Sequence, residues 1–367
     1  MSNLIIEYKD MVAFHPGYYI KDIIEENNWT QEEFAFRMET TPKTVSKLVR
    51  GEINLSDDLC IKLSNMFGTS VDVWSNLQKN YDNVLMEEEK ARLLEEQKKK
   101  LKLINYNFLV ETGIVEFTRN FQEKIKNIFS AFSISNLDYF FNQGKFENYR
   151  IGDSRTTEEK LVSSKLWLEV ALLSGKKQEV SNFDKKLLQE KIPEIRALTL
   201  LEMNEALVKL KEIFSECGVS FVLQKHLPNS IINGAVKWET RDKVILAMSD
   251  RKKFTDVFWF SLFHEIKHVL QEKRKKIILN EEKYSDEEEL DKLNENLEKE
   301  ADDYAKEKLI SETDFQNFLF MYDFSEESIK KFANEIGIHP GILVGRLQIE
   351  GHIPYSRCNN LRTKFYL

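Results

Sequence analysis

The chain has 367 residues, 42% of them hydrophobic, so it is long enough for two or three domains with buried cores. Its net charge of −8 excludes a protein that packages nucleic acid through overall positive charge, but not a local DNA-binding module. Three widely separated cysteines give neither a disulfide framework nor a cysteine-ligated zinc site. The N-terminus does not read as a signal peptide, and no apolar run approaches the roughly 20 residues of a membrane helix. We therefore expect a cytoplasmic protein with no membrane partner.

The chain is expected to have three parts: residues 1–82, residues 83–198 and residues 199–367. The first is predicted as short helices, and the second as a charged linker helix followed by a helical middle region. In the third, segments 219–223, 231–238 and 244–248 are rich in β-formers and predict a small sheet. Glycine and proline are scarce, at 13 and 6 residues, which favours helix elsewhere. The predicted fold class is therefore mainly α with a small β-sheet (α+β).

Two short helices separated by a tight turn are predicted in the N-terminal part. Thr30 followed by Glu33 is a capping box that begins the first helix. Thr41 before Pro42 is an N-cap followed by a first-turn proline, and Gly51 ends this second helix. The pattern is typical of a helix-turn-helix, whose second helix enters the major groove of DNA. A plain helical bundle with a solvated basic face is the alternative.

The outer face of the second helix carries candidate DNA contacts. Residues 41–50 include three basic residues and no acidic one, and phosphates require such local positive charge. Lys43 and Lys47 can reach guanine acceptors, and Thr44 can touch a thymine methyl group. Arg50 lies on the same outer face and completes the basic set.

Residues 15–82 resemble the XRE-type helix-turn-helix of HigA-family antitoxins, through HPG, WTQEEFA, TVSKLVRG and FGTSVDVWSNLQ. The resemblance implies a five-helix DNA-binding fold, usually a homodimer on a palindromic double-stranded operator. The residues that it places at the DNA are Gln31, Thr41, Pro42, Lys43, Thr44 and Lys47. Among them, the resemblance implies that Gln31 contacts a phosphate and that Thr41 caps the helix and donates to phosphate.

The segment His264-Glu265-Ile266-Lys267-His268 is an HExxH motif that follows a strongly apolar run. On a helix, residues four apart share a face, so His264 and His268 can bind one metal ion. Glu265 can reach a water held by that ion, take its proton and pass it to a leaving amine. The expected ion is Zn²⁺.

A zinc site of this kind needs a third protein ligand, and Glu298 on a later predicted helix is the candidate. Asp302 lies four residues on and can hydrogen-bond a ligand histidine. Glu300 is the alternative ligand, but it lies about 200° around the helix from Glu298, so only one of the two can face the metal. The sequence favours Glu298. His352, near the C-terminus, is a further candidate for stabilising a transition state.

The third part resembles the ImmA/IrrE family of metallopeptidases. The resemblance is carried by CGVSFV (217–222), INGAVKW (232–238), WFSLFHEIKH, EKEADDYAKEKLI and residues 329–351. It implies a zincin-like domain and a zinc endopeptidase with glutamate as the third ligand. Lys267 departs from the family, which usually has glycine before the second histidine, and this departure puts catalysis in doubt.

Together these features predict a DNA-binding transcriptional regulator, an antitoxin of a toxin-antitoxin system, whose zinc endopeptidase domain acts on a partner protein. The partner is a cognate toxin or a repressor that is cleaved. The alternative is a non-proteolytic regulator whose zincin domain is a scaffold that binds the toxin.

Overall fold

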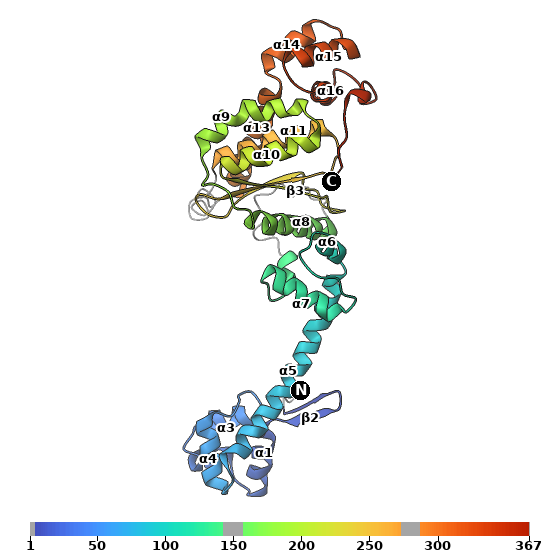
Figure 1. Ribbon diagram of the computed structural model, residues 1–367. Coiled ribbons are helices and arrows are strands. Elements are labelled where there is room, and N and C mark those ends of the chain that lie inside the picture. The colour runs from blue at the N-terminus through green and yellow to red at the C-terminus, as the bar shows by residue number, and fades with distance from the viewer. Residues whose placement is uncertain (1–3, 142–156, 273–286, 367) are drawn as a thin grey trace. The chain divides into compact units, whose positions relative to one another are not determined.

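The computed structural model describes residues 4–141, 157–272 and 287–366 and is predominantly helical, with small sheets (Figure 1). The predicted α+β class is confirmed. The chain divides into two compact units, Met1–Lys99 and Lys100–Leu367, and each is treated by itself. Residues 142–156 of the predicted helical middle lie outside the described residues. Among the helices of the described ranges, none is long and apolar enough to cross a bilayer.

The first unit is a helical bundle preceded by a hairpin. Its elements are β1 (Ile5–Tyr8), β2 (Met11–Phe14), α1 (Pro16–Glu26), α2 (Gln31–Arg37), α3 (Pro42–Val49), α4 (Asp57–Phe67) and α5 (Val71–Leu101). Phe34, Leu48 and Leu63 are fully buried at the centre of the bundle. The predicted helix-turn-helix is therefore present, as α2, a turn and α3. The helix predicted over the charged linker is the later part of α5.

The antiparallel hairpin of β1 and β2 was not predicted from the sequence. Its buried side chains, Ile6 and Ala13, pack on Tyr81 and Val84 of α5. Four-residue strands are too short to give a clear alternating pattern, and a two-stranded hairpin is marginal without such packing. The hairpin is therefore stabilised by contact with a distant helix.

Close backbone approach fixes the start of α1 against α3. His15 is buried and caps α1, its Nδ1 accepting from the Gly17 amide at 3.0 Å. A Cβ atom on Gly17 would lie 1.8 Å from the carbonyl oxygen of Leu48. Glycine is required here because only a residue without a side chain allows α1 to lie this close to the end of α3.

The second unit contains one three-stranded sheet among its described residues, together with the remaining helices. Its helices are α6 (Tyr106–Glu111), α7 (Phe121–Phe132), α8 (Glu158–Lys176), α9 (Lys185–Ala197), α10 (Met203–Glu216), α11 (Thr255–Gln271), α13 (Glu287–Leu309), α14 (Glu312–Phe320), α15 (Glu326–Glu335) and α16 (Pro340–Ile349). Its strands are β3 (Val219–Gln224), β4 (Gly234–Trp238) and β5 (Val244–Ser249). The three predicted strands are confirmed to within a few residues.

The sheet order is β3-β5-β4, with β3 parallel and β4 antiparallel to the central strand β5. Every residue of β5 is buried, because helices cover both faces of the sheet. α8 packs on one face, where Gly175 meets Ile245, and α10 and α11 pack on the other (Figure 1). α13 lies along α11. α11, which carries the HExxH motif, is therefore held between the sheet and α13.

The C-terminal segment is fastened to the first turn of α11 by a buried ion pair. Asp256 is 6% exposed and receives three hydrogen bonds from the Arg362 guanidinium, at 2.7 to 3.2 Å. The same guanidinium donates to Gln348 of α16 at 3.0 Å. Burial raises the pKa of Asp256, although the guanidinium opposes this effect.

Candidate functional site

The helix-turn-helix presents the predicted polar residues at the surface. Thr30 caps α2, its Oγ1 accepting from the Glu33 amide at 3.0 Å, and Thr41 caps α3 by accepting from the Thr44 amide at 3.1 Å. Val45 is buried and turns the other face of α3 toward the bundle core. Among the residues proposed to contact DNA, Gln31 is the first residue of α2, and the others lie at the start of α3, on its outer face or, for Arg50, at its C-cap.

The predicted contact residues differ in how free their side chains are. Gln31, Pro42 and Lys43 are exposed, and Lys47 is half-buried. Arg50 lies at the C-cap of α3 and pairs with Glu52, with 2.9 Å between Nε and Oε1. Since its charge is already balanced by that carboxylate, Arg50 is less available to phosphate than the two lysines.

In the second unit, α11 and α13 bring His264, His268 and Glu298 together. One ligand atom from each residue lies within 4.8 Å of the other two. The two Nε2 atoms are 3.0 Å apart, and the Glu298 oxygens lie 3.3 Å from His264 Nε2 and 3.4 Å from His268 Nε2. This donor set of two imidazole nitrogens and one carboxylate, all partly buried, fits a zinc ion with a position left open.

The second nitrogen of each histidine is also engaged. Asp302 lies 2.8 Å from His264 Nδ1, where the sequence placed it. Gln271, which the sequence analysis did not single out, has its Oε1 atom 3.0 Å from His268 Nδ1. Glu300, the alternative ligand, faces Lys267, with 3.6 Å between its Oε2 and Nζ, and lies outside the three-residue cluster. A signal for Gln271 was available, because a residue three positions after His268 shares its helix face.

Neighbouring imidazoles and carboxylates in this cluster shift one another's pKa values. Burial alone would lower the pKa of His264, but hydrogen bonds with Asp302 and Glu298 outweigh burial and raise it to about 10. The adjacent rings of His264 and His268 hold the pKa of Glu298 well below its ordinary value. A cation bound there would displace protons from the histidines, because the ligands of a metal must be deprotonated.

Glu265 is buried beside the cluster, with 9% of the residue exposed. Burial raises its pKa, opposed by the neighbouring His268 and His264, and a raised pKa suits a general base near neutral pH. Gly234 at the start of β4 leaves the space that the carboxylate fills, because a Cβ atom there would lie 2.6 Å from Glu265 Cγ. No local pattern in the sequence predicted this role for Gly234.

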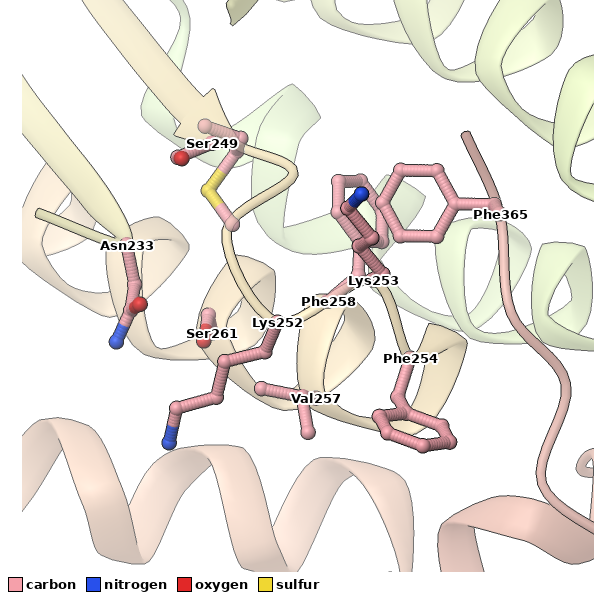
Figure 2. A pocket seen from close by; sticks show the side chains of 10 residues that line it. Asn233, Ser249, Lys252, Lys253, Phe254, Val257, Phe258, Ser261 and Phe365 are labelled. Carbon is pink, nitrogen blue, oxygen red and sulfur yellow. The ribbon is translucent and has the colours of Figure 1, made fainter. Parts of the chain in front are cut away.

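A small hollow lies beside the first turns of α11 (Figure 2). Its volume is about 10 Å³, room for about one water molecule rather than for a substrate side chain. Asn233 and Ser261 line it, and Ser261 is one turn before Glu265 on α11. The buried Oδ1 atom of Asn233 has no hydrogen-bond partner within the described residues. The ring of His352, the further candidate from the sequence, contacts the rings of Phe315 and Phe324.

Among the comparisons with known proteins, a helix-turn-helix family profile matches residues 20–74, within the first unit. The chain is 41% identical over 63 residues to YddM of Escherichia coli, an uncharacterized HTH-type transcriptional regulator, covering 17% of this chain and 67% of that protein. It is 24% identical over 85 residues to Virulence-associated protein I of Dichelobacter nodosus, covering 23% of this chain and 79% of that protein. Through its helix-turn-helix, the chain belongs to the helix-turn-helix family of transcriptional regulators.

Two solved structures also match part of the chain. One, described as an antidote protein of a plasmid maintenance system from Nostoc punctiforme, is 24% identical and has a TM-score of 0.23. The other, a HigA-family addiction module antidote protein from Coxiella burnetii, is 21% identical and has a TM-score of 0.21. Each covers 23% of this chain, and they cover 92% and 91% of the two matched chains.

Proposed function

We propose that this helix-turn-helix regulator is also a zinc-dependent endopeptidase, with residues 1–82 binding operator DNA and residues 199–367 forming the peptidase domain. The observation that carries the proposal is the convergence of two histidines and one glutamate from two helices, beside a buried second glutamate. A purely structural cluster of charges has no need of Glu265 at that position, and burying a carboxylate is costly.

In this proposal His264, His268 and Glu298 would hold the zinc ion, which would supply Lewis acidity for water and for a peptide carbonyl. Glu265 accepts the proton of the attacking water and delivers it to the amine that leaves. Asp302 holds the ring of His264 so that its Nε2 faces the cluster.

The biological setting that we propose is that of an antitoxin. Its support is the resemblance of residues 15–82 to HigA-family antitoxins, which implies a homodimer on its own palindromic operator. The partner protein would then be a cognate toxin or a repressor that the peptidase domain cleaves. Such a regulator would act in the cytoplasm, where its DNA lies.

The test is zinc content and cleavage measured on the same purified, full-length proteins. Wild type, His264→Ala, Glu265→Gln and Glu298→Gln are compared, with Glu295→Gln, an exposed glutamate on the same helix α13, as the matched control. The substrates are the product of the neighbouring gene and a library of quenched fluorescent peptides. We expect about one zinc per chain in wild type, Glu265→Gln and the control, and loss of zinc in the other two. Cleavage should survive only in wild type and the control.

Two outcomes would contradict parts of the proposal. A wild-type protein that takes up no zinc from metal-supplemented medium would remove the metal centre. A zinc-loaded Glu265→Gln variant that neutralises the neighbouring gene product as well as wild type would show that the domain acts as a scaffold rather than as a peptidase.

A further inference from the structure

The two proposed histidine ligands are held by different chemistry. His264 Nδ1 faces a carboxylate, Asp302, on α13. His268 Nδ1 faces an amide, Gln271, one turn further along its own helix α11. The metal-binding atom of each ring is Nε2, so each ring must carry its proton on Nδ1 to bind a metal as a neutral ligand.

The orientation of the Gln271 amide is determined by its other contacts. Its Nε2 atom donates to the Leu297 carbonyl oxygen and to Glu300 Oε2, each at 3.3 Å. Both of these oxygens only accept hydrogen bonds, so a flipped amide would place oxygen against oxygen. Oε1 therefore faces His268, and Nδ1 of the ring must be the donor.

Lys267 supports the same arrangement through Glu300. Its Nζ atom lies 3.6 Å from the Glu300 oxygen that accepts from Gln271, and 5.7 Å from the centre of the Tyr304 ring. The ion pair is weak because Glu300 is 57% exposed, yet it keeps that carboxylate beside the Gln271 amide. Lys267 thus has contacts that a glycine at its position lacks.

We propose that Gln271, supported by Glu300 and Lys267, is a positioning residue that holds His268 in the tautomer that binds metal. This inference rests on the proposed function, because it concerns the affinity of the same zinc site. Removing the hydrogen-bond partner of a ligand histidine typically weakens metal binding about 10–100-fold. Gln271 and His268 therefore act as one unit in which the amide contributes affinity without touching the ion.

The first test is zinc affinity of the metal-free, full-length protein, measured by competition with a chromophoric chelator. Gln271→Leu should bind zinc about 10–100-fold more weakly than wild type. Gln271→Glu should bind more tightly than Gln271→Leu, because a carboxylate oxygen still accepts from the ring. Lys267→Met should weaken binding a few-fold, whereas its matched control Lys308→Met, whose Nζ lies 5.6 Å from the same Tyr304 ring, should not.

The second test reads the tautomer without zinc. Nitrogen-15 spectra of the six histidine rings are recorded on the metal-free protein over a pH series, and the tautomer is read where the His268 ring is neutral. His268 is assigned by its absence in His268→Ala. We expect the Nδ1–H tautomer in wild type and Gln271→Glu, and a mixture in Gln271→Leu.

The two tests separate the inference from the proposed function. Zinc binding that is equal in wild type and Gln271→Leu, at equal thermal stability, overturns the role of Gln271 and leaves the metal site standing. A wild-type protein that binds no zinc overturns the metal site, and the spectra then decide the role of Gln271 by themselves. A wild-type His268 ring that is protonated on Nε2 alone overturns the inference.

Discussion

Gly234 lies so close to Glu265 that the smallest side chain there must move the proposed general base. In Gly234→Ala the new Cβ atom would lie 2.6 Å from Cγ and 2.8 Å from Oε1, whereas ordinary contacts are 3.4–4 Å. Glu265 is 9% exposed, so its carboxylate has little free space to occupy instead. The substitution should therefore shift the carboxylate by about 1 Å, and a misplacement of that size costs about 100-fold in rate.

The same substitution should leave the metal ligands in place. Overpacking of this kind costs about 1–3 kcal/mol of stability, or a few degrees in Tm for a unit of this size. Zinc affinity should remain within a few-fold of wild type, because the clash is with Glu265 and not with His264, His268 or Glu298. The expected signature is a zinc-loaded, folded protein with strongly reduced kcat.

Gly175→Ala is the matched control, because its Cβ atom would also meet a side chain at 2.6 Å, that of Ile245 on the opposite face of the sheet. Both variants are compared with wild type in thermal unfolding, zinc affinity and cleavage of the peptides that wild type cleaves. Equal losses of cleavage in the two variants would indicate a general packing defect. Undiminished cleavage by Gly234→Ala would refute the placement of Glu265 as the base.

Three further predictions concern charge. The affinity for the DNA upstream of the gene should fall with salt, and Lys47→Gln should make the slope of log affinity against log salt less steep by about 0.9. Arg50→Gln should change this slope less, because Arg50 is already paired with Glu52. The raised pKa of His264 contributes stability to the metal-free protein that is fully present below about pH 6.5 and is lost as pH rises through about 10. Its removal in His264→Gln should flatten that pH profile of Tm. Arg362→Gln should cost about 3–5 kcal/mol in chemical denaturation by leaving Asp256 buried without its partner, and Asp256→Asn in the same chain should recover part of the loss.

Local sequence signals predicted the parts of this fold that depend on local chemistry. Thr30 and Thr41 are caps because their hydroxyls satisfy amides at the start of a helix, and both begin helices where expected. The β-rich segments of the second unit form its three strands, because the strand preference of β-branched and aromatic residues acts over a few residues. The spacing of the two histidines in HExxH is likewise a property of one helix turn.

Features that depend on contacts between distant segments were not accessible in this way. The hairpin of β1 and β2 is stabilised by α5, and the parallel pairing of β3 with β5 requires the intervening β4 to lie on the far side of β5. The space for Glu265 is made by Gly234, 31 residues earlier, and no periodicity within α11 indicates it. In each case the structure is stabilised by packing between elements that are far apart in the sequence.

The choice between Glu298 and Glu300 shows how the local and distant constraints combine. Helix geometry alone says that only one of them can face α11 at the level of the histidines. The structure places Glu300 beside Lys267 and Gln271, while both oxygens of Glu298 approach the histidine rings. A lysine before the second histidine thus provides a partner for the carboxylate that does not join the cluster. Lysine at position 267 is therefore compatible with an intact donor set, and its ion pair holds Glu300 away from the histidine rings.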